Sequence, residues 1–177
     1  MNFTAMDFET ANRHYDSACS LALVLVRDNK IIDSFYTVIN PQMPFDKNNI
    51  KIHGITANDV KNAPTMDEVW PKIRLLFQPG MLVVAHNARF DCNVMKKSLK
   101  KYNIAEPHYL TIDTLATSRA LMPNLKNYRL DTVSNQLNID LWHHHNALSD
   151  SEACAEILIK QNQQFGDEQI KKFIKYI

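Results

Sequence analysis

The sequence of 177 residues predicts an α/β protein in which helices cover a mixed β-sheet. Two observations carry this prediction. Three apolar stretches of strand length follow one another near the N-terminus, and strand-like and helix-like stretches then alternate along the rest of the chain. Consecutive strands favour antiparallel pairing, whereas strand–helix units favour parallel pairing. We therefore expect a sheet that is antiparallel at one edge and parallel at the other.

The antiparallel part is predicted from "FTAMDFET", "CSLALVLVRDN" and "KIIDSFYTVIN", which polar, turn-like residues such as those at 28–30 separate. A loop is expected over residues 41–64. Thr65 and Glu68 then have the spacing of a capping box, which predicts a helix that runs to about Phe77.

The alternating part begins with "MLVVAHN", a buried strand, followed by "ARFDCNVMKKSLKKY", a helix, and "HYLTID", a second strand. Further helices are expected over 114–121, 129–138 and 146–163. The final residues, "GDEQIKKFIKYI", predict a short terminal helix whose lysines face solvent. A hydrophobic content of 45% is sufficient for a core, so we expect a single domain over residues 1–177.

Composition excludes few functions. The formal net charge of +1 shows no strong electrostatic attraction for nucleic acid, although a neutral total can hide a basic face. The three cysteines, Cys19, Cys92 and Cys154, form no C-x-x-C pair, which argues against a disulfide framework and a thiolate zinc site. The longest apolar run, "LALVLV", is too short to cross a bilayer, and the N-terminus does not resemble a signal peptide. We expect a soluble, cytoplasmic protein without membrane contact.

The first candidate site residues are Asp7 and Glu9, two acids inside an apolar strand. Side chains at i and i+2 of a strand share a face and lie roughly 6.5–7 Å apart along the backbone. Taken alone, the pair fits an amphipathic strand with one wet face. It also fits a divalent-cation site, because a hard cation relieves the repulsion between two ionised carboxylates.

Two further acids are predicted to point inward from helices. Asp91 shares a helical stripe with Val94 and Met95, and Asp150 shares one with Cys154. An aspartate near a helix start is often only a cap or a partner of the helix dipole. An unpaired carboxylate on a buried face is costly, however, and one shared cation cluster accounts for both acids together with the strand pair.

The arrangement of these acids resembles a known family. "DFET", "HNARFD" and His145-x-Ala147-x-x-Asp150 are similar to the three motifs of the DnaQ-like 3′-to-5′ exonucleases, of the DEDDh type that has histidine in its third motif. "IHGIT" at 52–56 is a further typical element. The sister type has tyrosine where this chain has Asn146. The resemblance covers about residues 3–160 and leaves 161–177 as a terminal helical tail.

The resemblance implies a ribonuclease H-like fold with a five-stranded mixed sheet and two Mg²⁺ or Mn²⁺ ions. Asp7 would bridge both ions, Glu9 and Asp150 would complete the shell of one, and Asp91 would act mostly through water. Two ions can hold the attacking and leaving oxygens of phosphodiester hydrolysis and neutralise charge in the transition state. His145, whose ordinary pKa is near 6.5, would act as the general base.

Weaker candidates surround these motifs. Phe8 and Phe90 would stack on the 3′-terminal bases or, alternatively, pack in the core. Thr10 would hold the terminal 3′-hydroxyl. We expect His53 and Asn87 to line the same pocket. All of these are predicted substrate contacts, whereas His143 and His144 are expected to be loop surface.

The substrate expected from the family is nucleic acid with a free 3′ end, with DNA favoured, because the chain resembles stand-alone bacterial members and the proofreading subunit of the replicative polymerase. An RNA-trimming enzyme similar to ribonuclease T or oligoribonuclease is an alternative, and so is a non-catalytic binding module. A DNA polymerase or a sliding clamp is a weaker partner: "QLNIDL" loosely resembles clamp-binding peptides, but Leu137 also fits a helix core. The lysines at 96, 97, 100 and 101 fit phosphate contacts or a solvated helix face.

Overall fold

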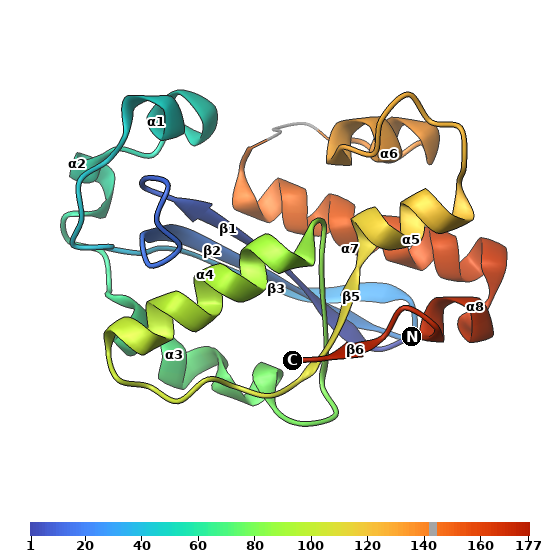
Figure 1. The fold of residues 1–177 in the computed structure, drawn as a ribbon, viewed down its shortest axis with the longest axis horizontal. Helices are drawn as coiled ribbons and strands as arrows, with labels where there is room; N and C mark the ends of the chain where they lie inside the picture. The colour runs from blue at the N-terminus through green and yellow to red at the C-terminus, as the bar shows by residue number, and fades with distance from the viewer. Residues whose placement is uncertain (142–144) are drawn as a thin grey trace.

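A mixed six-stranded sheet forms the centre of the computed structural model, which describes residues 1–141 and 145–177 (Figure 1). The strand order is β3-β2-β1-β4-β5-β6. β2 pairs antiparallel with both β1 and β3, whereas β4 pairs parallel with β1 and β5. The strands are β1 (Phe3–Thr10), β2 (Ala18–Arg27), β3 (Lys30–Val38), β4 (Leu82–Ala85), β5 (Leu110–Asp113) and β6 (Lys175–Tyr176). The predicted mixed sheet with an antiparallel edge is confirmed, but the other edge, predicted to be parallel, ends in the antiparallel pair of β5 and β6.

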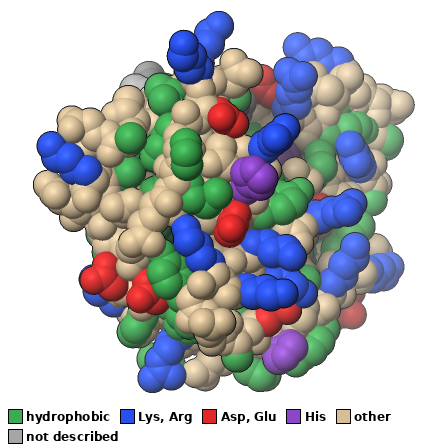
Figure 2. All heavy atoms as spheres, turned by 60° about the vertical axis from the view of Figure 1, so that its left-hand side comes forward, with side chains coloured by type: hydrophobic (Ala, Val, Ile, Leu, Met, Phe, Trp, Pro, Cys, Tyr) green, Lys and Arg blue, Asp and Glu red, His purple; other side chains and the backbone are tan. Residues whose placement is uncertain are grey.

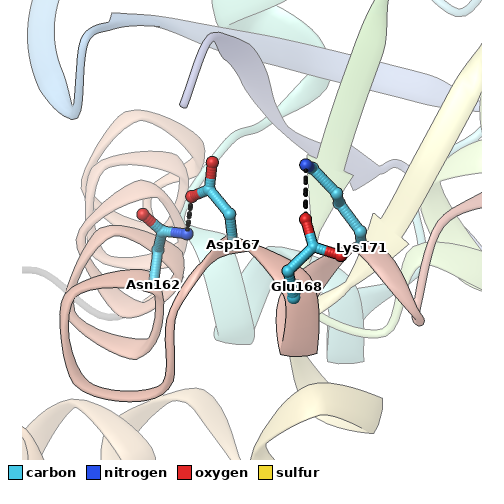
Figure 3. Close-up of polar contacts among 4 residues, drawn as sticks. All are labelled: Asn162, Asp167, Glu168 and Lys171. Carbon is cyan, nitrogen blue, oxygen red and sulfur yellow. Dashed lines mark hydrogen bonds and ion pairs between the residues drawn. The ribbon is translucent and has the colours of Figure 1, made fainter.

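The count of five strands is wrong by one. The chain ends in the short helix α8 (Asp167–Lys171) and then β6, which pairs antiparallel with β5 through Leu110–Tyr176 and Thr111–Lys175. A strand of two residues leaves no alternating pattern in the sequence, so only its pairing with β5 reveals it. In α8, Lys171 binds Glu168 at 2.9 Å, and Asn162 of the preceding helix donates to Asp167 (Figure 3).

The loop predicted over residues 41–64 contains two short helices, α1 (Lys47–His53) and α2 (Ala57–Val60). No residue of α1 is buried, and α2 is only four residues long. Neither segment therefore has the apolar stripe that identifies a helix in a sequence.

The remaining helices follow the sequence pattern closely. The backbone N–H of Thr65 donates to Glu68 Oε2 at 2.8 Å, so the predicted capping box is present, and the 3₁₀ turn η1 extends that helix to Phe77. The helices are α3 (Met66–Ile73), η1 (Arg74–Phe77), α4 (Ala88–Lys101), α5 (Thr114–Leu121), α6 (Leu130–Gln136) and α7 (Ala147–Phe165). None of the helices in the described ranges is long and apolar enough to cross a membrane.

Alternation along β1 divides the core between two faces of the sheet. Met6 and Phe8 belong to a hydrophobic cluster with Met95 of α4, whereas Phe3 and Ala5 belong to a second cluster that includes residues of α7. Figure 1 shows α4 (green) and α7 (orange) running beside the central strands. Odd-numbered residues of β1 therefore share the face that α7 covers.

Candidate active site

Two acids of β1 and one of α7 are placed together by this alternation. Asp7 and Glu9 continue the odd-numbered face of β1, against which α7 packs. Asp150 lies in the first turn of α7, which begins after Asn146 caps it by accepting hydrogen bonds from two backbone N–H groups of that turn. The end of β1 and the start of α7 thus form one acidic cluster.

The fourth acid reaches the cluster from the other side of the sheet. Asp91 lies in the first turn of α4 and is only 2% exposed. Its Oδ1 accepts a hydrogen bond of 3.0 Å from the backbone N–H of Phe8, the residue between Asp7 and Glu9. The chain turns into α4 through Asn87, whose φ of 75° is in the left-handed region, where asparagine is well tolerated.

Burial disfavours ionisation of all four acids, and repulsion between them adds to this for Asp7, Glu9 and Asp91. Burial raises the pKa of Asp7 well above its usual range, and the charges of Asp91, Glu9 and Asp150 add to this. Burial, followed by repulsion from Asp150, raises the pKa of Glu9 to about 8. Burial also raises the pKa of Asp150 to about 6 and that of Asp91 well above its usual range. A bound cation would reverse this penalty.

The donor set fits a divalent metal ion. One ligand atom each of Glu9, His145 and Asp150 lies within 4.8 Å of the others. Asp150 Oδ2 accepts a hydrogen bond of 3.1 Å from the backbone N–H of His145, while Asp150 Oδ1 is buried and has no hydrogen-bond partner among the described residues. An orphaned buried carboxylate oxygen beside further acids is suited to a hard cation, so the predicted metal dependence fits this site.

A cavity of about 810 Å³ opens over the acids, a volume within the roughly 300–1,000 Å³ typical of ligand sites. The predicted residues that line it are Asp7, Phe8, Glu9, Asn87, Phe90, His145 and Asp150. Asp91 is not among its lining residues and touches the site through the Phe8 backbone. Figure 2 shows acidic and histidine side chains near the centre of one face, with Lys and Arg side chains around them.

The aromatic candidates lie where either of their predicted roles is feasible. Phe8 lines the cavity but is only 2% exposed and packs in the core cluster of α4. Phe90 is half-buried, and its ring lies edge-on to that of Tyr15 at 5.9 Å. Contact with substrate remains a prediction for both.

Thr10 and His53 are not among the residues that line the cavity. The Thr10 carbonyl accepts from Asn49 Nδ2 at 2.8 Å and lies 3.1 Å from His53 Nε2. His53 Nδ1 accepts from the backbone N–H of Ile55, so Nε2 carries the ring proton and donates to Thr10. His53 thus anchors α1 to the end of β1, next to Glu9.

Several weaker expectations are placed by their contacts. Lys96 pairs with Glu106 at 2.7 Å, and Lys101 Nζ donates to the Pro41 carbonyl, so part of the lysine cluster is engaged within the fold. Leu137, in the segment compared with clamp-binding peptides, packs against a hydrophobic cluster between α6 and α7. His143 and His144 lie outside the described residues.

The pattern of the sequence did not single out one group of lining residues. They are His86 and, from the end of α5 and the loop before α6, Arg119, Asn127, Tyr128 and Arg129. His86 belongs to the "HNARFD" motif, which was the available signal. The other four belong to no motif, and the predicted helices over 114–121 and 129–138 did not indicate that Arg119 and Arg129 lie near the acids, so only the fold brings them there.

One protein family and several known proteins match this chain over most of its length. The family described as Exonuclease matches residues 4–158. A DNA polymerase III PolC-type from Caldanaerobacter subterraneus subsp. tengcongensis is 39% identical over 171 residues, which is 96% of this chain. One from Bacillus cereus is 37% identical over 160 residues, 89% of this chain. The chain spans only 12% and 11% of the length of these two relatives.

Among solved structures, "Exonuclease X in complex with 5' overhanging duplex DNA" is similar, with a TM-score of 0.79 and 26% identity. The match covers 97% of this chain and 98% of the other. Similarity over nearly the whole of both chains supports the ribonuclease H-like architecture that the motifs imply.

Proposed function

The chain belongs to the exonuclease family, and we propose that it is a divalent-metal-dependent 3′-to-5′ exonuclease that releases nucleoside monophosphates from DNA. The family match and the PolC-type relatives confirm the predicted family and the predicted enzyme class, a nuclease hydrolase. We further propose that residues 1–177 act as one exonuclease domain.

The proposal is supported by four carboxylates that converge from three elements: three of them line one cavity, and the fourth, Asp91, lies behind it against the Phe8 backbone. Asp7 and Glu9 come from β1, Asp91 from α4 and Asp150 from α7, and each has a raised pKa. A fold does not maintain this repulsion without a use for it, since a neutral core would be more stable. Ligation of cations that act on phosphodiesters is the use that the family supplies.

Each acid has a proposed place in the reaction. Asp7, Glu9 and Asp150 would hold two Mg²⁺ or Mn²⁺ ions. Asp91 would keep the end of β1, and with it Asp7 and Glu9, in position by accepting the hydrogen bond of the Phe8 backbone. The ions, when bound, supply positive charge to the scissile phosphate and its leaving oxygen. Asp150 also accepts a hydrogen bond from the backbone N–H of His145, and this bond keeps the proposed general base next to the acids.

His145 is proposed to accept the proton of the attacking water. Its side chain is exposed and lines the cavity, so it can reach a water beside the substrate. Its backbone has a φ of 68°, a conformation in which histidine is enriched among non-glycine residues. The residue therefore combines the required chemistry with a fixed position at the start of α7.

DNA is the proposed substrate because the Exonuclease X structure contains duplex DNA and the two relatives compared above are DNA polymerases. Proofreading of newly made DNA is the proposed process, and a DNA polymerase is the proposed partner. A sliding clamp is a weaker proposal, because Leu137 of the clamp-like segment packs inside the fold.

The test compares matched DNA and RNA oligonucleotides, labelled at the 3′ or the 5′ end, single-stranded and duplex, with Mg²⁺ and then with Mn²⁺. Mononucleotides should appear at once from 3′-labelled DNA, with a ladder from 5′-labelled DNA. Faster loss of RNA would contradict the proposed substrate. A covalently closed single-stranded circle is the control: cutting it as fast as the linear strand would exclude an exonuclease.

A further inference from the structure

A second part of the cavity wall comes from α5 and the loop before α6. It consists of four residues, which we call the arginine wall: Arg119, Asn127, Tyr128 and Arg129. Both arginines are exposed, and neither is in an ion pair with a residue that the structure describes. Asp131 also lines the cavity, but its Oδ1 accepts from the backbone N–H of Thr132 at 2.6 Å. Two guanidinium groups thus border the cavity without an acidic partner.

Tyr128 holds this wall in place. Its carbonyl lies 2.9 Å from His86 Nε2, and its hydroxyl donates to the Met122 carbonyl at 3.2 Å. The Arg119 guanidinium lies 6.0 Å from the centre of the Tyr128 ring, within cation–π range. Side chains that are ordered in advance lose less entropy when they bind, so these contacts prepare Tyr128 and Arg119 for a ligand.

His86 connects the arginine wall to the sheet. Because a carbonyl only accepts, Nε2 carries the ring proton, and in the neutral ring Nδ1 accepts from Thr114 Oγ1, 2.9 Å away. Burial lowers the pKa of His86, which favours that neutral ring. His86 directly follows β4 and therefore joins the loop before α6 to the sheet and to α5.

The next residue of the same motif makes a second connection. The backbone N–H of Asn87 donates to Asp113 Oδ1 at 2.9 Å, and the same oxygen accepts from the backbone N–H of Leu115 at the start of α5. The helix that carries Arg119 is thus positioned by the residue that also begins α4 and places Asp91. The acids and the arginine wall are fixed to one frame.

The chemistry of the substrate indicates what the arginines bind. A 3′-terminal nucleotide is attached through one phosphodiester, the scissile one, and this belongs at the carboxylates. Every other phosphodiester in the strand lies on its 5′ side. Guanidinium groups bind phosphate with paired hydrogen bonds, so two arginines that have no ion pair among the described residues are suited to phosphates of the strand.

We propose that Arg119 and Arg129 bind phosphates of the substrate strand on the 5′ side of the scissile bond, and that His86 is the positioning residue that holds them there. This proposal rests on the proposed exonuclease function. It assigns the arginine wall to strand binding and leaves bond cleavage to the acids and His145.

The test uses two substrates that differ in upstream phosphates. The p-nitrophenyl ester of thymidine 5′-monophosphate has a single phosphodiester and none upstream, whereas a thymidine decamer has many. Replacing both arginines, R119A with R129A, should raise KM for the decamer by about tenfold or more with little change in kcat. KM for the ester should not change. The matched control is R74A, an exposed arginine that does not line the cavity.

Salt dependence gives an independent readout. Each phosphate contact on a single strand contributes about 0.7 to the slope of log affinity against log salt, so the double variant should lose roughly 1.4 from that slope for the decamer. Equal losses on both substrates, or no loss on the decamer, would overturn the proposal. If the wild-type protein cleaves neither substrate, the proposed function fails. Decamer binding in Ca²⁺, followed by fluorescence anisotropy, then still decides whether the arginines hold the strand.

The role of His86 is tested by rescue. His86→Ala should raise KM for the decamer but not for the ester, and should add little to the double arginine variant. His86→Gln keeps a donor for the Tyr128 carbonyl and should restore most of the affinity. A loss for both substrates in both His86 variants, with the arginine result intact, would remove His86 from the proposal.

Discussion

The two charged parts of the cavity are built in different ways. Asp7 and Glu9 are buried beside other acids, and their pKa values are raised, so without a cation their ionised forms destabilise the fold. Arg119 and Arg129 are exposed and stay hydrated, so holding them near the cavity costs the fold little. This difference fits the two proposed roles, in which the acids bind a cation for cleavage and the arginines bind the strand.

The largest expected effect comes from removing the cation or a central ligand. Chelation should abolish nuclease activity, and Mg²⁺ or Mn²⁺ should restore it. Asp7→Asn should also abolish turnover, yet the metal-free variant should melt at the same or a higher temperature, because one of the repelling charges is gone. Asp33→Asn, on the exposed face of β3, is the matched control.

The opposite outcomes would contradict the proposed role of the acids as cation ligands. Full activity in chelator would show that the acids do not hold a catalytic cation. A large drop in melting temperature of Asp7→Asn would show that the acid stabilises the fold and is not a strained ligand.

Removal of the proposed base should have the next largest effect. His145→Ala should lower kcat by about 10²- to 10⁴-fold, the usual contribution of general-base catalysis, with KM for the decamer largely retained. The wild-type rate should rise with pH through an apparent pKa, and that limb should change in the variant. Near-normal activity in His145→Ala, or a greater loss in His143→Ala or His144→Ala, would show that another group is the base.

The pH dependence of stability sharpens the comparison further. The pKa of Glu9 is raised from 4.5 to about 8 and that of Asp150 from 3.8 to about 6, so the folded protein binds protons more tightly than the unfolded chain. The part of the stability that these two carboxyl groups contribute is therefore fully present below about pH 4 and is lost as the pH rises through 6 towards 8. Thermal melts in chelator should show this decline, and Mg²⁺ should reduce it. A melting temperature that rises over the same pH range would contradict the raised pKa values.

The smallest effect concerns the hydroxyl that orders the arginine wall. Tyr128→Phe removes the hydrogen bond to the Met122 carbonyl and should raise KM for the decamer by roughly two- to fivefold, with kcat unchanged. Steady-state kinetics on both substrates measure it. Tyr102→Phe, whose hydroxyl is 3.5 Å from Gln42 and away from the cavity, is the control. If Tyr128→Phe changed kcat for the single-phosphodiester ester, the arginine wall would take part in bond cleavage and not only in strand binding.

Local patterns in the sequence predict five of the six strands and all four acids. An apolar stretch of strand length identifies β1, and the two-residue period of a strand puts Asp7 and Glu9 on one face. Helical stripes put Asp91 and Asp150 on the buried sides of α4 and α7. These are local rules of periodicity, which operate between near neighbours in the chain. The capping box at Thr65 and the family motifs belong to the same class of short-range signal.

Three features depend on contacts between distant parts of the chain: β6, the position of α1, and the arginine wall. β6 forms because its backbone pairs with β5, more than sixty residues earlier in the chain. α1 is held in place by hydrogen bonds from His53 and Asn49 to the Thr10 carbonyl and has no apolar stripe. The arginine wall reaches the acids because His86 and Asn87 bond to α5 and the loop before α6. Such contacts join residues far apart in sequence through single hydrogen bonds. They leave no periodic pattern, since nothing in a residue's neighbours specifies a distant partner.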